Sequence, residues 1–127
     1  MNGAPTEHAE AAMLIRACKA AEATHPELRL LYAIPNGGHR AWRTAAQMKA
    51  EGVKAGVPDY HLPVARGGYI GLWVELKRTK GGRLQPEQRA WMDALAAQGH
   101  RVALCKGWEA AFNVIRDYLA DNGPDEE

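Results

Sequence analysis

Two segments of this chain carry apolar residues at helical spacing, one near each end. The first runs from about residue 7 to residue 24 behind Thr6 as its N-cap. Its predicted buried stripe is Leu14, Cys18 and Ala21, and the stripe of the closing helix is Trp108, Phe112, Ile115 and Leu119. Both segments predict amphipathic helices that pack an apolar face on a common core.

The residues between these two helices alternate between strand-like and helix-like patterns. The predicted elements are a strand over 28–34, a helix over about 39–51 closed by Gly52, a hairpin over 56–77, a helix from Pro86 to Gly99, and a strand over 100–105. The order is therefore helix, strand, helix, hairpin, helix, strand, helix. That order predicts an α/β fold, with a mixed central sheet covered by helices.

The hairpin is the most informative stretch, because its turn fixes which residues face one another. Two apolar runs flank the turn Gly67-Gly68. An antiparallel register centred on Gly67 sets Asp59 beside Glu75. Glu75 and Lys77 are two residues apart, so strand alternation puts both on one face and Leu76 on the other.

Two neighbouring carboxylates repel each other and destabilise a sheet unless something neutralises them. A hard divalent cation such as Mg²⁺ takes oxygen ligands and would do so, and a nearby Lys can orient an attacking water. The alternative is that Glu75 and Lys77 form an ordinary solvated strand face, because both residue types are common. Asp59 in matching register favours the metal site.

Two further side chains of the hairpin bear on this face. His61 lies two residues after Asp59 and therefore shares its face. We expect a structural role for it rather than a role as general base. Strict alternation also puts Trp73 on the face of Glu75 unless a bulge intervenes, and the pattern leaves this open.

Length and composition are those of one globular domain over 1–127, with residues 1–5 and 121–127 expected to be flexible. No apolar run is long enough to span a membrane, and the polar start does not resemble a signal peptide. Cys18 and Cys105 lack metal-type spacing, so we expect buried core residues in a reducing cytoplasm.

The net charge of +1 conceals an uneven distribution. Residues 40–89 hold ten Lys and Arg against four Asp and Glu, and the flanks hold six against eleven. A central positive surface of this kind suits a phosphate backbone. Its candidate contacts are Arg40, Arg43, Lys54, Arg78, Lys80 and Arg83. The glycine-rich loop 78–84 lacks the Walker pattern, so no nucleotide cofactor is expected.

Several of these residues also carry a family resemblance. Pro58-Asp59 followed by Glu75-Leu76-Lys77 resembles the signature of the PD-(D/E)xK nucleases. The string 52–59, with Glu75-Leu76-Lys77-Arg78 and Gln88, is similar to the VRR-Nuc branch, whose stand-alone members are typical of phages and prophages. The resemblance covers about residues 7–119. It implies a restriction-endonuclease-like core and a metal-dependent DNA endonuclease.

The resemblance also implies roles for single residues. Asp59, Glu75, the Leu76 carbonyl and Glu7 would hold Mg²⁺ or Mn²⁺, with Glu10 as a possible substitute for Glu7. Lys77 would position the attacking water, and Gln88 and Asn36 would orient the phosphate or the water. Asn36 is otherwise a simple turn residue.

Two alternatives remain beside a DNA endonuclease: a catalytically silent DNA-binding module of the same fold, and a metal-dependent RNase. We also predict a homodimer, because one site cuts one strand and two copies cut two. Trp42, Trp91 or Trp108 could anchor the interface, although a monomeric nickase needs none. The resemblance favours four-way or forked DNA as substrate.

Overall fold

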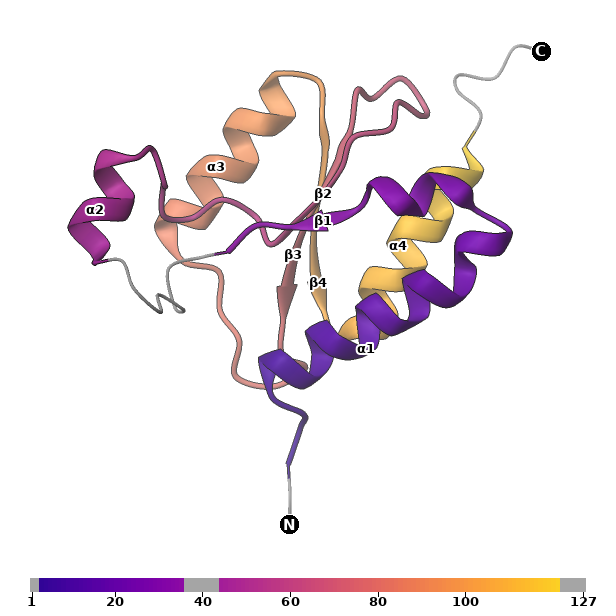
Figure 1. Ribbon diagram of the computed structural model, residues 1–127, viewed down its shortest axis with the longest axis horizontal. Coiled ribbons are helices and arrows are strands. Elements are labelled where there is room, and N and C mark those ends of the chain that lie inside the picture. Colours follow the sequence, from indigo (N-terminus) through magenta and orange to yellow (C-terminus); the bar gives the residue numbers. More distant parts are fainter. Residues whose placement is uncertain (1–2, 36–43, 122–127) are drawn as a thin grey trace.

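A mixed sheet forms the centre of the computed structural model, which describes residues 3–35 and 44–121 (Figure 1). Its strands are β1 (Tyr32–Ala33), β2 (Tyr60–Leu62), β3 (Leu72–Lys77) and β4 (Arg101–Lys106), in that spatial order. β1 pairs with β2, and β2 with β3, in antiparallel fashion, whereas β3 and β4 are parallel. The parallel pair is joined through a helix, as such a crossover requires. The α/β architecture predicted from the sequence is confirmed.

The helices cover both faces of this sheet. They are α1 (Glu7–Ala20), α2 (Ala45–Ala50), α3 (Pro86–Ala97) and α4 (Trp108–Ala120). α1 and α4 lie against each other on the face that holds the apolar core, and α3 lies on the opposite face (Figure 1). No helix within the described ranges is long and apolar enough to cross a membrane.

The ends of the helices follow the signals in the sequence. The Thr6 hydroxyl accepts the Ala9 N–H at 3.0 Å and caps α1. α2 begins with a reciprocal pair, in which the Thr44 hydroxyl accepts the Gln47 N–H and the Gln47 amide oxygen accepts the Thr44 N–H. α2 is the described part of the helix predicted over 39–51. Gly52 follows it with φ +99°, a left-handed value that favours glycine.

The strand predicted over 28–34 is wrong for most of its length. Residues Pro26–Leu30 form a 3₁₀ helix, and β1 contains only Tyr32 and Ala33. Pro26 fixes a helical φ at the start of this turn, and the Leu28 N–H then bonds the His25 carbonyl at 3.0 Å. Leu28 is buried while Leu30 is 53% exposed, so the apolar run does not line a strand face.

The hairpin has the predicted register. Tyr60 pairs with Val74, and Leu62 pairs with Leu72, so the next pair in the same register is Asp59 with Glu75. Gly67 and Gly68 form a two-residue turn with φ values of +59° and +87°, and Arg66 pairs with Tyr69 across it. That turn alone would set Asp59 opposite Leu76. The arm 63–65 is one residue longer than the arm 70–71, and this extra residue shifts the strands into the register that sets Asp59 beside Glu75.

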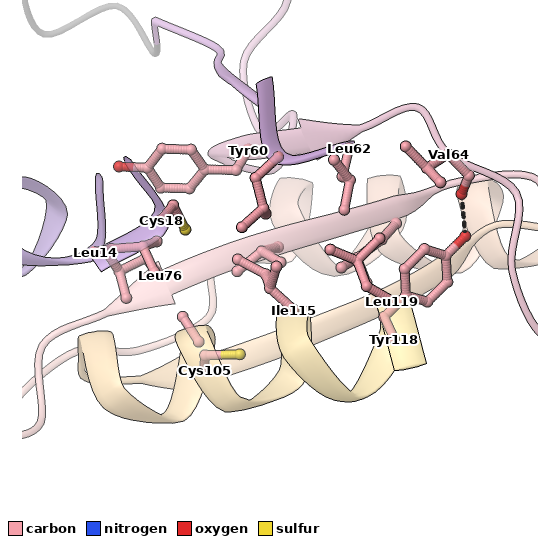
Figure 2. Packing of buried hydrophobic residues seen from close by; sticks show 14 residues of the cluster. Leu14, Cys18, Tyr60, Leu62, Val64, Leu76, Cys105, Ile115, Tyr118 and Leu119 are labelled. Atoms are coloured by element: carbon pink, nitrogen blue, oxygen red, sulfur yellow. Dashed lines mark hydrogen bonds between the residues drawn. The ribbon is translucent and has the colours of Figure 1, made fainter. Parts of the chain in front are cut away.

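The core lies between the sheet and the pair α1 and α4. Figure 2 shows side chains of both helices meeting those of β2 and β3, among them Leu14, Leu62, Leu76, Ile115 and Leu119. Cys18 and Cys105 are buried and not disulfide-bonded, which confirms them as core residues. Burial raises the pKa of both thiols to about 11, so neither is a reactive thiolate at neutral pH.

One buried hydrogen bond ties α4 to the hairpin. The Tyr118 hydroxyl donates to the Val64 carbonyl at 2.5 Å, and Tyr118 is almost fully buried (Figure 2). Tyr118→Phe should lower the free energy of unfolding by about 1–3 kcal/mol, because the carbonyl loses its partner away from water. Urea denaturation would measure this. Tyr69→Phe, at an exposed tyrosine, is the control, and an equal loss in both variants would contradict the assignment.

Candidate functional site

Strand β3 presents two charged residues on the sheet face opposite the core. Its pairing with β4 runs without a break from Leu72 to Lys77, so no bulge alters the alternation. Leu76 points into the core (Figure 2), and Glu75 and Lys77 point the other way. They are only 1% and 7% exposed, and the Lys77 ammonium lies 3.3 Å from Glu75 Oε2. A buried ion pair of this kind is costly unless further partners stabilise it.

Asp59 joins this pair from the end of β2. Its Oδ2 accepts the Leu76 N–H at 2.7 Å, and its main-chain carbonyl accepts the Ile34 N–H at 2.8 Å. The hydrogen bond from Leu76 holds the Asp59 carboxylate beside β3, and the hydrogen bond from Ile34 holds the Asp59 main chain. This is the position that the register predicted.

Gln88 reaches the same point from helix α3. Its Nε2 donates to Glu75 Oε2 at 3.0 Å, and its Oε1 accepts from Lys77 Nζ at 3.0 Å. Oε1 also accepts the Gln85 N–H at 2.8 Å, which fixes the amide relative to the start of α3. The amide connects the carboxylate to the ammonium, so the three side chains form one hydrogen-bonded unit.

The electrostatics of Glu75 are unusual for a carboxylate. Its pKa is raised to about 7, because burial and then the charge of Asp59 raise it by more than Lys77 lowers it. Glu75 Oε1 is buried and has no hydrogen-bond partner within residues 3–35 and 44–121. A buried oxygen without a partner, beside a second carboxylate, has the chemistry of a ligand for a hard divalent cation.

The two candidates for a third carboxylate, Glu7 and Glu10, are placed differently on α1. Glu7 lies on the solvent side of the first turn of α1 and is exposed. Glu10 is the residue that turns inward, and its Oε1 accepts the Trp108 N–H at 2.8 Å at the start of α4. No three His, Cys, Asp or Glu side chains in residues 3–35 and 44–121 are grouped to hold a metal. Mg²⁺ commonly takes only one or two carboxylates plus water, so Asp59 and Glu75 fit that ion.

The predicted phosphate contacts fall on two loops next to these residues. Lys54 lies on the loop that leads to Asp59, and Arg78, Lys80 and Arg83 follow Lys77 directly. All four side chains are exposed. Arg78 also donates to the Pro5 carbonyl at 3.2 Å. Asn36, Arg40 and Arg43 lie outside the described residues.

An aromatic cluster that the sequence did not predict continues the same sheet face. The His61 ring stacks on Trp73 with centroids 3.9 Å apart, and the Trp73 indole N–H donates to His100 Nδ1 at 3.1 Å. The Tyr32 hydroxyl lies 2.7 Å from His61 Nδ1. Burial and His100 lower the pKa of His61, which favours its neutral form. The hairpin register already paired His61 with Trp73, so it contained the signal.

The raised pKa of Glu75 predicts a pH effect on the metal-free protein. The folded chain holds the Glu75 proton up to about pH 7, whereas the unfolded chain loses it near the ordinary value of 4.5. The stabilisation that Glu75 provides when protonated is therefore present below pH 4.5 and is lost as the pH rises to about 7. Denaturation in EDTA should show wild-type protein losing stability relative to Glu75→Gln across this window. A pH-independent difference would contradict the shift.

The fold and the site together define a class of protein: a mixed sheet whose central hairpin brings an Asp, a Glu and a Lys together is the arrangement of a PD-(D/E)xK nuclease. Comparison with known proteins identifies the branch. A family model for the VRR-NUC domain matches residues 7–109. A solved structure described as a VRR-NUC domain protein is 25% identical, with a TM-score of 0.79 over 96% of this chain and 95% of the other. A search of the curated proteins gave no match.

The chain therefore belongs to the VRR-NUC domain family. This is a nuclease family, so membership supports a nuclease-type function that acts on DNA.

Proposed function

We propose that this protein is a metal-dependent DNA endonuclease that hydrolyses phosphodiester bonds with Mg²⁺ or Mn²⁺. The observation that carries the proposal is the buried Glu75 beside the partly buried Asp59. Glu75 Oε1 lacks a hydrogen-bond partner among residues 3–35 and 44–121, and Lys77 lies 3.3 Å from the other oxygen. A purely structural ion pair would satisfy both carboxylate oxygens.

Asp59, Glu75 and the Leu76 carbonyl would hold the ion. The N–H and C=O of one strand residue point to the same side of the strand, and the Leu76 N–H points to Asp59. Its carbonyl therefore faces the same edge. When bound, the ion would offset phosphate charge and acidify water.

Lys77 and Gln88 complete the site. The Lys77 ammonium is held between Glu75 Oε2 and Gln88 Oε1, which restricts a flexible side chain to one place. A fixed ammonium beside two carboxylates can orient an attacking water and offset charge on the phosphate. Gln88 would position Lys77 and Glu75 through its hydrogen bonds to both side chains. Its amide would also help to orient the attacking water beside Lys77.

DNA would be held by the loops that flank the site. Lys54, Arg78, Lys80 and Arg83 are exposed on the loops beside Asp59 and Lys77, which suits contacts to phosphates rather than to bases. The contacts proposed for Asn36, Arg40 and Arg43 rest on the sequence alone.

Two alternatives are less well supported. A catalytically silent DNA-binding module would keep the basic loops, but it would not need a buried Glu75 and Lys77 bonded to Gln88 beside Asp59. A metal-dependent RNase would share the chemistry of the site, and substrate tests separate it from a DNA endonuclease.

The proposal extends to a homodimer that acts on four-way or forked DNA, because a single site cuts one strand and a two-fold pair would cut two. Light scattering at micromolar concentration tests the dimer. A monomer mass with full activity would exclude it, and equal rates on linear and four-way DNA would exclude the substrate preference.

A cleavage panel tests the proposed function itself. Linear, flapped, forked and four-way DNA, together with an RNA of matched sequence, would be incubated in Mg²⁺, Mn²⁺ or EDTA. We expect DNA cleavage with either metal and none with EDTA. Cleavage of the RNA alone would favour the RNase, and cleavage in EDTA would exclude a metal mechanism.

A further inference from the structure

A cavity of about 730 Å³ lies between α2, the loop 52–56 and the start of α3. Its volume is within the range of about 300–1,000 Å³ that is usual for small-molecule sites. None of the roles assigned so far accounts for it.

The cavity adjoins the proposed catalytic site through one residue. Gln88 lines the cavity and also bonds Glu75 and Lys77. A molecule in the cavity would therefore lie across this amide from the two charged residues. This places it within reach of a DNA strand whose phosphate sits at Glu75.

The walls of the cavity combine three kinds of chemistry. Met48, Val53 and Ala55 provide apolar surface, and Val53 is 40% exposed although it is a large aliphatic side chain. Lys49 and Lys54 are exposed and also line it, which suits an anion. The flat faces of a nucleobase and the charge of its phosphate match these two features.

The third feature is a polar group on the opposite wall. Glu87, at the first turn of α3, lines the cavity and can accept hydrogen bonds from the exocyclic N–H groups of a base. The wall is also firmly built at this point. Gly56 has φ +92°, and a Cβ there would lie 2.8 Å from the Glu87 backbone, so the loop and α3 are in close contact.

We propose that this cavity receives one unpaired nucleotide of the DNA substrate, with its base between Met48, Val53 and Ala55 and its phosphate near Lys49 and Lys54. The inference deepens the proposed function and rests on it. It defines the favoured substrate class as DNA with an unpaired nucleotide beside the cut, because such a base enters a cavity without the cost of unpairing and unstacking that a duplex base carries.

Binding of three DNA molecules tests this without any cleavage. They are a plain duplex, the duplex with a flap of three thymidines, and the duplex with a flap of three abasic units. Each flapped duplex would be made in two forms, with the flap at a 5′ end or at a 3′ end. Fluorescence anisotropy would be measured in EDTA and in Ca²⁺. We expect wild-type protein to bind a thymidine flap at least about fivefold more tightly than the abasic flap, the lower limit for stacking one base.

Two variants and a control connect this preference to the cavity. Ala55→Trp places a large ring against Met48 and Val53, where the base is proposed to lie, and Val53→Asp places a carboxylate in the apolar wall. Both variants should therefore bind the two flaps equally. Ala110→Trp, at an exposed position on α4 beyond the opposite face of the sheet, should keep the preference. Circular dichroism and thermal unfolding would identify any variant that fails to fold.

Several results would overturn the inference. The first is equal binding of both flaps by wild-type protein. The second is a preference for the thymidine flap that survives in folded Ala55→Trp and Val53→Asp. The third is a change in the solution mass of those variants, which would indicate that a second copy of the chain occupies the cavity. Failure of the proposed function is separate, because it would appear as absence of metal-dependent cleavage on every DNA.

Discussion

Asp59→Asn is expected to abolish metal-dependent DNA cleavage, with a loss of turnover on the order of a thousandfold or more. The change removes one negative ligand but keeps an oxygen that can accept the Leu76 N–H, which lies 2.7 Å from Asp59 Oδ2. The local structure should therefore remain. Cleavage of labelled DNA at saturating Mg²⁺ is the measurement.

Stability should move in the opposite direction to activity in this variant. The charge of Asp59 helps to raise the pKa of Glu75, so its removal relieves a repulsion and should leave the fold equally stable or slightly more stable. Asp93→Asn, at an exposed carboxylate of α3, is the matched control and should change neither property. Undiminished Mg²⁺-dependent cleavage by Asp59→Asn would remove Asp59 from the site.

Lys77→Met should lower turnover by roughly a hundredfold to ten-thousandfold while metal and DNA binding stay close to those of the wild type. Methionine keeps the apolar stem of a side chain that is 9% exposed, but it removes the ammonium held by Glu75 and Gln88. The loss therefore falls on the step in which the water and the phosphate must be oriented.

Single-turnover cleavage with separate binding isotherms would distinguish these effects. Lys106→Met is the control, because Lys106 is opposite Lys77 in the β3–β4 register but is exposed. Normal turnover in Lys77→Met would make Lys77 a structural residue. A loss confined to DNA binding would make it a phosphate contact.

The hairpin shows how far sequence reasoning extends. Strict alternation is a local rule, and it predicted the shared face of Glu75 and Lys77. A turn centred on Gly67 predicted the pair Asp59 and Glu75, and β2 and β3 have that register because the arm 63–65 holds one residue more than the arm 70–71. Gln88 was named through the family resemblance, and the structure shows that α3 brings its amide to Glu75 and Lys77.

The errors lie where packing between elements decides. The apolar run 28–34 is compatible with a strand, yet Pro26 and the burial of Leu28 favour a 3₁₀ turn. The choice between Glu7 and Glu10 was left open by the sequence for a related reason: they share a face of α1, and only the position of α4 shows that Glu10 is the one turned inward. The metal-ligand role of either residue stays a prediction.

The cavity beside Gln88 could not be predicted for the same reason. Its walls come from α2, the loop 52–56 and α3, and no sequence period relates these segments. The close approach of Gly56 to Glu87 is a tertiary contact. A glycine permits such a contact, but its presence in the sequence does not predict which residue it will meet.

The central claim is that Asp59 and Glu75 form a divalent-cation site. The direct test is to measure Mn²⁺ binding to the protein without DNA, by electron paramagnetic resonance at pH 8. Wild-type protein should bind Mn²⁺, Mg²⁺ should compete for it, and Asp59→Asn and Glu75→Gln should each lose it, whereas Lys77→Met should retain it. Equal Mn²⁺ binding by wild type, Asp59→Asn and Glu75→Gln would contradict the account.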